Sequence, residues 1–318
     1  MNESIWTQVQ RIETLLVQAS AKTHRHLAGK HREDYGIESG LNEALLIRMG
    51  SGLDVNGFRV ADYQVRYPFS SATKLQEALN EMTTTHGWME IVADGQYALS
   101  PSGKEIVSSW MHNMGEMIMS LDLGDVSEND IDLLIQYDHE ILETLSEAER
   151  PHNRPIFSNR LRGVQPDYAT SELWHHWQLV WTMIACREDE EKYVLKQSAL
   201  PPLVWFVRRQ LSFIDRKPWL VRGPMTVEFL ARRAEGYSPL DDPIQEVTHT
   251  ISQLDELGWL HKADKDEYRL TEAGLAAFDH DEKQVEQNFE SIWPDFGERT
   301  PKFLELLARF TAHLQGFM

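Results

Sequence analysis

A short pattern that occurs twice in the chain constrains its fold more than any other feature. The segment GWMEIVADGQYALSPSG begins at Gly87, and GWLHKADKDEYRLTEAG begins at Gly258. The two segments align without a gap, and each closes on a glycine, Gly103 in the first and Gly274 in the second. A repeat at a fixed spacing indicates that one supersecondary unit is built twice.

Each copy of the pattern predicts the same local structure. The glycine that opens it is a typical helix stop, and short strand-like runs lie on both sides of a central turn. Ser100 and Thr271 stand where a side-chain hydroxyl would cap the next helix. The predicted strands are Trp88–Val92 and Tyr97–Leu99 in the first copy, and Trp259–Lys262 and Tyr268–Leu270 in the second. Helix, β-hairpin, helix is the order of a winged helix.

Further helices are predicted around each copy. A short helical segment precedes it, at 58–67 in the first and at 225–235 in the second. A polar turn then leads into the helix that ends at the opening glycine. Two helices joined in this way form a helix-turn-helix, whose second helix enters the major groove of DNA. Long helical segments flank both units.

These elements predict a mainly α fold (α+β). Two winged helix-turn-helix domains with small β-wings would sit on a helical body that has pseudo-twofold symmetry. The predicted halves are residues 1–149 and 168–318, with winged helices at about 53–107 and 220–278. Residues 150–167 contain three prolines and no clear period, and a linker is expected there.

A wing that ends in YRLTEAG and lies between long helices resembles the MarR type of bacterial regulator. Proteins of that family are homodimers whose terminal helices form the dimer body and whose winged helices meet successive major grooves. The resemblance implies two such protomers fused in tandem, acting as a DNA-binding transcriptional regulator on double-stranded DNA, with a small aromatic ligand as a candidate effector. A fused pair already buries the pairing surface, so we expect a monomer or a weak dimer.

The charge balance opposes the DNA-binding interpretation. The chain has 31 basic and 50 acidic residues and a formal net charge of −19. Affinity for duplex DNA comes largely from basic residues that neutralise phosphates. The alternative is an acidic winged-helix protein that binds another protein, or mimics DNA, instead of binding DNA. A basic face across both winged helices would favour DNA, and acidic recognition helices would favour the alternative.

If the chain binds DNA, the contacts are expected from the second helix of each helix-turn-helix, from the helix before it in the second half, and from the second wing. The first wing, EIVADGQYALS, contains no basic residue. Asp241 and Asp242 stand at the start of the second recognition helix, where they would repel a phosphate. The candidate DNA-binding residues are Thr73, Lys74, Gln76, Arg232, Arg233, Thr248, His249, Lys262, Lys265 and Arg269.

A tryptophan stripe stands out in the helix predicted after the linker. Trp174, Trp177 and Trp181 recur at spacings of three and four residues, which places them on one helical face. This stripe is interpreted as core between the two halves. The alternative is a pocket for a small aromatic ligand, completed by His175 and Arg187.

Other candidate sites are few. The single cysteine, Cys186, excludes an internal disulfide, and the acids that follow it favour a buried structural thiol over a redox sensor. The charged run REDEEK at 187–192 is interpreted as a solvated helix face. No metal, cofactor or catalytic motif is present, so we expect no metal, no cofactor and no enzymatic activity. No apolar run predicts a membrane span, and a cytoplasmic location is expected.

Overall fold

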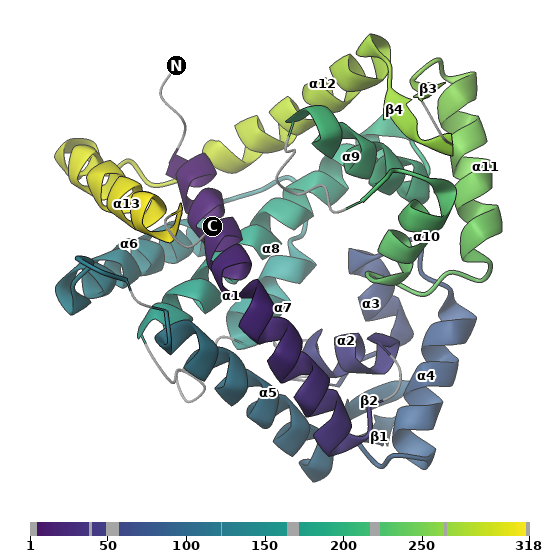
Figure 1. Cartoon of the computed structure of the whole chain (residues 1–318), viewed down its shortest axis with the longest axis horizontal. Coiled ribbons are helices and arrows are strands. Elements are labelled where there is room, and N and C mark those ends of the chain that lie inside the picture. The colour runs from purple at the N-terminus through teal and green to yellow at the C-terminus, as the bar shows by residue number, and fades with distance from the viewer. Residues whose placement is uncertain are drawn as a thin grey trace.

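The computed structural model describes residues 5–37, 40–48, 57–121, 123–163, 172–216, 223–263 and 266–315. This part of the chain is mainly helical, with two small antiparallel sheets of two strands each (Figure 1). The mainly α class predicted from the sequence is therefore confirmed. Among the described residues, no helix is both long enough and apolar enough to cross a membrane.

The elements follow one another in the same order in the two halves of the chain. The first half consists of α1 (Ile5–Tyr35), α2 (Gly40–Arg48), α3 (Val60–Arg66), α4 (Ala72–Thr84), β1 (Met89–Ala93), β2 (Gln96–Leu99), α5 (Pro101–Met119) and α6 (Glu128–Glu147). The second half consists of α8 (Glu172–Ser198), α9 (Pro202–Arg216), α10 (Val227–Glu235), α11 (Pro243–Glu256), β3 (Leu260–Lys262), β4 (Tyr268–Leu270), α12 (Glu272–Glu290), a short 3-10 turn (Gly297–Arg299) and α13 (Thr300–Gln315).

The first copy of the repeated pattern folds around two glycines. Gly87 ends the preceding helix with φ of +66°, a conformation that glycine adopts without steric cost. The Ser100 hydroxyl donates to the Gly87 carbonyl (2.6 Å) and accepts the Gly103 amide (3.1 Å), so it caps α5 as predicted. The amide of Ser100 also donates to the Trp88 carbonyl (3.0 Å). These bonds join the end of one helix to the start of the next across the hairpin.

The second copy has the same hydrogen bonds. Gly258 has φ of +69°, and the Thr271 hydroxyl donates to its carbonyl (2.8 Å). That hydroxyl also accepts the Gly274 amide (3.1 Å), and the Thr271 amide donates to the Trp259 carbonyl (3.0 Å). The duplicated sequence therefore encodes a duplicated local structure, in which the hydroxyl and the closing glycine have the same function in each copy.

Each hairpin is extended by one backbone contact from the segment before the short helix. Phe58 exchanges two backbone hydrogen bonds with Tyr97 on β2 (2.6 and 2.8 Å). In the second half, the Tyr268 amide on β4 donates to the Met225 carbonyl (3.0 Å). The contact lies on the same side of both hairpins, so β1 and β3 are the strands left at the outer edge.

The terminal helices of each half pack against those of the other half (Figure 1). Helix α1 lies along α13, and α6 lies along α8. Trp6 on α1 meets Phe289 on α12 edge to face, with ring centroids 4.9 Å apart. Tyr137 on α6 stacks on Phe303 of α13 at 4.2 Å. One continuous apolar core therefore includes side chains from both halves.

The segment predicted as a linker contains a helix. Helix α7 (Pro155–Gly163) occupies part of residues 150–167 and packs on α8. Its Ile156 and Phe157 side chains are buried. The three prolines had favoured an irregular segment, but Pro155 lies at the first helical position, where its fixed φ suits a helix.

Candidate functional site

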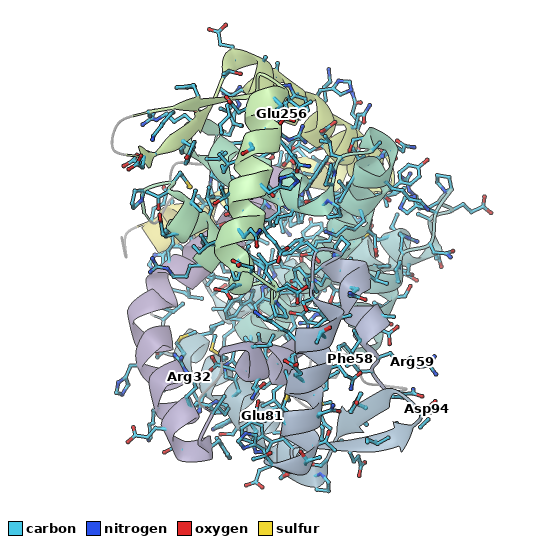
Figure 2. The ribbon with its side chains drawn as sticks, turned by 90° about the vertical axis from the view of Figure 1, so that its right-hand side faces the viewer. Arg32, Phe58, Arg59, Glu81, Asp94 and Glu256 are labelled. Carbon is cyan, nitrogen blue, oxygen red and sulfur yellow. The ribbon has the colours of Figure 1, made fainter. Side chains whose placement is uncertain are left out.

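Helices α4 and α11, which the sequence predicted as DNA-reading helices, meet at their N-terminal ends. In Figure 2, Glu256 lies near the far end of α11 and Glu81 near the far end of α4, with the two N-termini between them. The Ser71 amide donates to the Pro239 carbonyl (2.8 Å), and the Ser71 hydroxyl donates to Asp241 (2.5 Å). The hydroxyls of Ser70 and Ser238 also form a hydrogen bond. The start of each helix is thus held against the start of the other.

The exposed side chains of these two helices are mostly acidic or neutral. Thr73, Thr248 and His249 are exposed, as DNA contacts would require, whereas Lys74 and Gln76 are half-buried. The Gln76 amide donates to Asn80 (3.1 Å) and to the Tyr97 hydroxyl. We call the exposed carboxylates of α4, α11 and the turn before α11 the acidic ridge: Glu77, Glu81, Asp241, Asp242, Asp255 and Glu256.

The other DNA-binding candidates lie on α10 and on the second hairpin. Lys262 on β3 is exposed and forms an ion pair with Asp266 (2.5 Å). Arg269 on β4 and Arg232 on α10 are exposed. Arg233 donates to Gln210 on α9 (3.0 Å), so its guanidinium faces the protein. Lys265 lies outside the described residues. Of the nine candidates that the structure describes, some are therefore exposed, while others are half-buried or bonded to the protein, and they do not form one open basic face.

The first hairpin has an apolar surface. Ile91 and Val92 on β1 are 61% and 51% exposed, and they are among the most exposed large apolar residues of the described chain. Neighbouring Glu90 and Asp94 are exposed as well. This hairpin offers apolar and acidic groups to solvent, which do not suit contact with a phosphate backbone.

The tryptophan stripe lies in the core. Trp174 and Trp177 are buried, and Trp181 is partly buried. The three rings meet edge to face, with centroids 5.0 to 6.5 Å apart. Of the remaining pocket candidates, His175 contacts His139 on α6 (3.3 Å), and Arg187 forms an ion pair with Glu282 (2.5 Å). The rings fill the space between the halves with one another, as the core interpretation predicts.

The charged run that follows the stripe is buried, so its interpretation as a solvated helix face was wrong. We call Arg187–Lys192 the charged segment of α8. The residues Arg187, Asp189, Glu190 and Glu191 are at most 4% exposed. A buried charge is stable only when it is paired and hydrogen-bonded, and each of these groups has a partner on another element.

The partners of the charged segment come from all sides of α8. Arg187 pairs with Glu282 on α12 (2.5 Å), and Glu188 pairs with Arg66 on α3 (2.7 Å). Glu190 accepts two hydrogen bonds from the Arg150 guanidinium (2.9 and 2.5 Å). The segment therefore connects both halves and the residues between them.

The two remaining carboxylates bind α7 and α9. Asp189 accepts the backbone amides of Ile156 (3.2 Å) and Phe157 (2.8 Å) at the start of α7. Glu191 accepts two bonds from Arg209 (2.5 and 2.6 Å) and one from the Trp205 indole (3.0 Å). Burial raises the pKa of Asp189 to about 7, and the two amides only partly offset this.

A sequence signal for this burial does exist. The residues of α8 before the charged segment, ELWHHWQLVWTMIAC, are apolar on most sides of the helix. A helix that is apolar all round is buried, and its continuation by one or two turns is buried with it. Cys186 is fully buried beside Arg154, and burial raises the pKa of its thiol to about 12, as expected for a structural cysteine.

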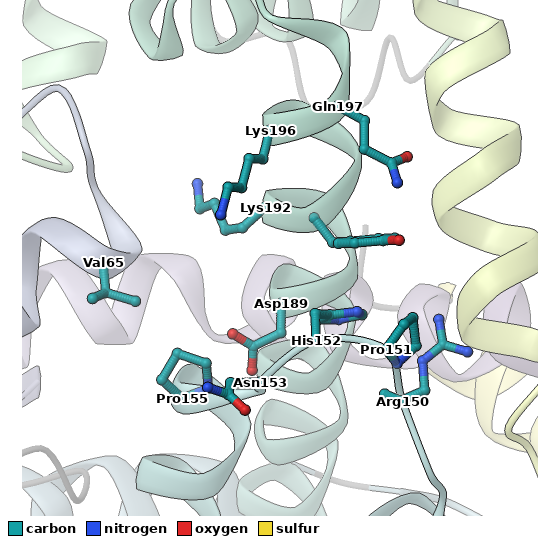
Figure 3. A pocket seen from close by; sticks show the side chains of 11 residues that line it. Val65, Arg150, Pro151, His152, Asn153, Pro155, Asp189, Lys192, Lys196 and Gln197 are labelled. Carbon is teal, nitrogen blue, oxygen red and sulfur yellow. The ribbon is translucent and has the colours of Figure 1, made fainter.

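An open cavity of about 790 Å³ lies over the charged segment (Figure 3). We call it the α8 cleft. Its walls are the end of α3, the residues between α6 and α7, and the exposed side of α8. The lining residues are Val65, Arg150, Pro151, His152, Asn153, Pro155, Asp189, Lys192, Tyr193, Lys196 and Gln197.

Known proteins give no further guidance to the site. No family model, no curated protein and no solved structure matches this chain. Within the described ranges, no group of three or more histidine, cysteine, aspartate or glutamate side chains is arranged to hold a metal ion.

Proposed function

We propose that this chain is a fused pair of MarR-like winged helices that binds the basic surface of another protein through its acidic ridge, in place of DNA. The observation that carries the proposal is the contact between the N-termini of α4 and α11, flanked by exposed carboxylates. Of the two hypotheses drawn from the sequence, this is the alternative to a DNA-binding regulator.

The fused-pair part of the proposal rests on order and packing. Both halves repeat the same succession of helices around equivalent hairpins. Helix α1 of the first half packs on α13 of the second, and α6 of the first half packs on α8 of the second. The terminal helices of each half therefore pack on those of the other half. In a MarR-like dimer the terminal helices form the body in the same manner. This reciprocal packing supports the proposed pseudo-twofold arrangement of the two halves, in which a second chain would be unnecessary.

The geometry of α4 and α11 disfavours DNA. Two recognition helices that read one duplex place their N-terminal residues in major grooves about 34 Å apart. Here the N-cap residue of α4, Ser71, is bonded directly to Pro239 and Asp241 beside the start of α11. Neither end is free to approach base edges, and the two ends cannot enter separate grooves while this contact persists.

The charge of the ridge favours a basic protein. Six exposed carboxylates lie on these two helices and the turn before α11, whereas the one lysine of α4 among the DNA candidates, Lys74, is half-buried, Lys262 is paired with Asp266, and Arg233 is bonded to Gln210. Opposite charge across an interface steers association and sets specificity. Ile91 and Val92 on β1 supply an exposed apolar area near α4. Acidic and apolar groups together suit a basic protein surface better than a phosphate backbone.

A titration with DNA tests the choice between the two hypotheses. We expect no binding of a labelled mixed-sequence duplex, measured by fluorescence anisotropy at about 50 mM salt, where electrostatic attraction is strong. Binding with a steep salt dependence, lost when Lys262 and Arg269 are changed to glutamate, would instead support the DNA-binding regulator. The second hairpin would then be its contact surface.

A capture experiment tests the ridge itself. Wild-type protein and a ridge variant with Glu77→Gln, Glu81→Gln, Asp255→Asn and Glu256→Gln are immobilised and exposed to lysate of the source cells. A basic protein should be recovered on the wild type and reduced at least tenfold on the ridge variant. The control variant Glu105→Gln, Glu116→Gln, Glu272→Gln and Glu290→Gln removes four other exposed carboxylates and should not change the recovery. If the ridge variant recovers as much of the basic protein as the wild type does, the contact surface lies outside the acidic ridge.

A further inference from the structure

We propose that the α8 cleft binds a small organic phosphate. The cleft is separate from the acidic ridge, and the proposal does not depend on whether the ridge binds protein or DNA. Its volume of about 790 Å³ falls in the range of small-molecule sites. Its walls come from α3, from the residues between α6 and α7, and from α8, so a bound ligand would contact both halves of the chain.

The lining of the cleft is cationic, although the chain carries a net charge of −19. Arg150, Lys192 and Lys196 face one carboxylate, that of Asp189. The Asp189 oxygens accept two backbone amides, and the Arg150 guanidinium is bonded to Glu190. The two lysine ammonium groups therefore remain as the charges available to a ligand.

The two lysines lie one helical turn apart and share a direction. Figure 3 shows the side chains of Lys192 and Lys196 extending from the same side of α8, toward the part of the cleft that Val65 closes. Neither ammonium group forms an ion pair within 4 Å among the described residues. An anion bound between Lys192 and Lys196 would form ion pairs with both ammonium groups.

The charged ammonium group of Lys192 is destabilised by its burial. Burial lowers the pKa of Lys192, and the negative charges of Glu191 and Glu188 offset the effect only in part. Those two carboxylates already bind Arg209 and Arg66. A partly buried cation without a full complement of counter-charge is stabilised by an anion that enters beside it.

A histidine, His152, also lines the cleft. Neither ring nitrogen of His152 has a hydrogen-bond partner, although both are buried from solvent. Its ring stacks on Tyr193 at 4.3 Å, which fixes its orientation, and Nε2 lies 3.4 Å from Glu190. The amide of Asn153 on the rim offers a polar contact to a ligand in the cleft.

The chemistry favours a phosphate over an aromatic monocarboxylate. Carboxylates are bound best by the paired donors of arginine, but the arginine here is occupied by Glu190. Lysine binds phosphate as a compact point charge, and two lysines match a dianion. The apolar part of the lining consists of Val65, two prolines and the ring of Tyr193, which is already stacked on His152.

Calorimetric titration of the full chain tests the proposal. The probes are adenosine monophosphate and ribose 5-phosphate, with adenosine and benzoate as comparisons. We expect both phosphates to bind, and neither comparison compound. Lys192→Met with Lys196→Met should weaken phosphate binding by about tenfold or more, because each lysine contributes a charged hydrogen bond. The control pair Lys283→Met with Lys302→Met removes two lysines outside the cleft and should leave the affinity unchanged.

Several outcomes would overturn the proposal. They are the absence of heat with either phosphate at millimolar concentration, equal binding of adenosine, and tighter binding of benzoate than of phosphate. If the Lys192→Met, Lys196→Met variant binds phosphate as tightly as the wild type, the phosphate site lies outside the α8 cleft. Lys196 is exposed, so the single Lys196→Met variant retains the fold and keeps the test decisive if the double variant does not fold. Its affinity for phosphate should also fall by about tenfold.

Discussion

Replacing Gly103 with alanine is expected to lower the free energy of unfolding by about 2 kcal/mol. A Cβ atom built at Gly103 would lie 2.0 Å from the carbonyl oxygen of Trp88. That oxygen accepts the Ser100 amide, so it cannot move away without weakening the bond that joins the hairpin to α5. The gain in helix propensity from glycine to alanine, about 1 kcal/mol, is too small to compensate.

The second copy provides an internal comparison. At Gly274 the added Cβ would lie 2.4 Å from the Trp259 carbonyl oxygen, so Gly274→Ala should destabilise the protein in the same way. At Gly29, on α1, an added Cβ would meet no neighbouring atom within 4 Å, and Gly29→Ala should be neutral or slightly stabilising. Urea denaturation of the three variants measures the differences. A Gly103→Ala variant as stable as Gly29→Ala would contradict the assigned role of the closing glycine.

The parts of the fold that were predicted correctly depend on interactions between residues close in sequence. The hairpins, the glycine stops at Gly87 and Gly258, and the caps at Ser100 and Thr271 are set by bonds within the repeated pattern. Backbone conformation and short-range hydrogen bonding decide them, and the sequence displays both. Comparison of the two copies strengthened each prediction, because chance rarely repeats a pattern of this length.

The parts that were missed depend on long-range contacts. Nothing local indicates that Ser71 meets Pro239, or that Arg66 pairs with Glu188. A run of charged residues on a helix is usually solvated. The apolar stretch of α8 before the charged segment indicates that the segment is buried, but the groups that pair with its charges come from distant parts of the chain. The same limit applies to the α8 cleft, whose walls come from three separate stretches of the chain.

The buried carboxylate of Glu191 should contribute more to stability than any surface charge. Its oxygens accept hydrogen bonds from Arg209 and from the Trp205 indole, and the carboxylate itself is buried. Glu191→Gln removes the charge and leaves the guanidinium of Arg209 without it, which is expected to lower the free energy of unfolding by about 3–5 kcal/mol. Glu140 is a matched control, because it also binds an arginine, Arg299, through two oxygens but at an exposed position. Glu140→Gln should lower the free energy of unfolding by less than about 1 kcal/mol.

The effect of Glu191 should also depend on pH in a defined direction. Burial alone raises the pKa of Glu191, but the charges of Arg209, Lys192 and Arg187 outweigh it and lower the pKa to about 2, from 4.5. A folded-state pKa below the unfolded value stabilises the native state fully above about pH 4.5, and this stabilisation disappears as the pH falls toward 2. The lowered pKa corresponds to about 3 kcal/mol, in line with the effect expected of the variant.

Urea denaturation of wild type and Glu191→Gln at pH 7, 5 and 3 isolates this contribution, because other titrating groups cancel in the difference. The stability difference should be the same at pH 7 and pH 5 and clearly smaller at pH 3, since protonation of the unfolded chain then removes the advantage of the ionised carboxylate. A difference that stays constant down to pH 3 would mean that Glu191 acts by packing alone. In that case the pairing with Arg209 would hold the shape of α8 against α9 without a net electrostatic gain, as some buried ion pairs do.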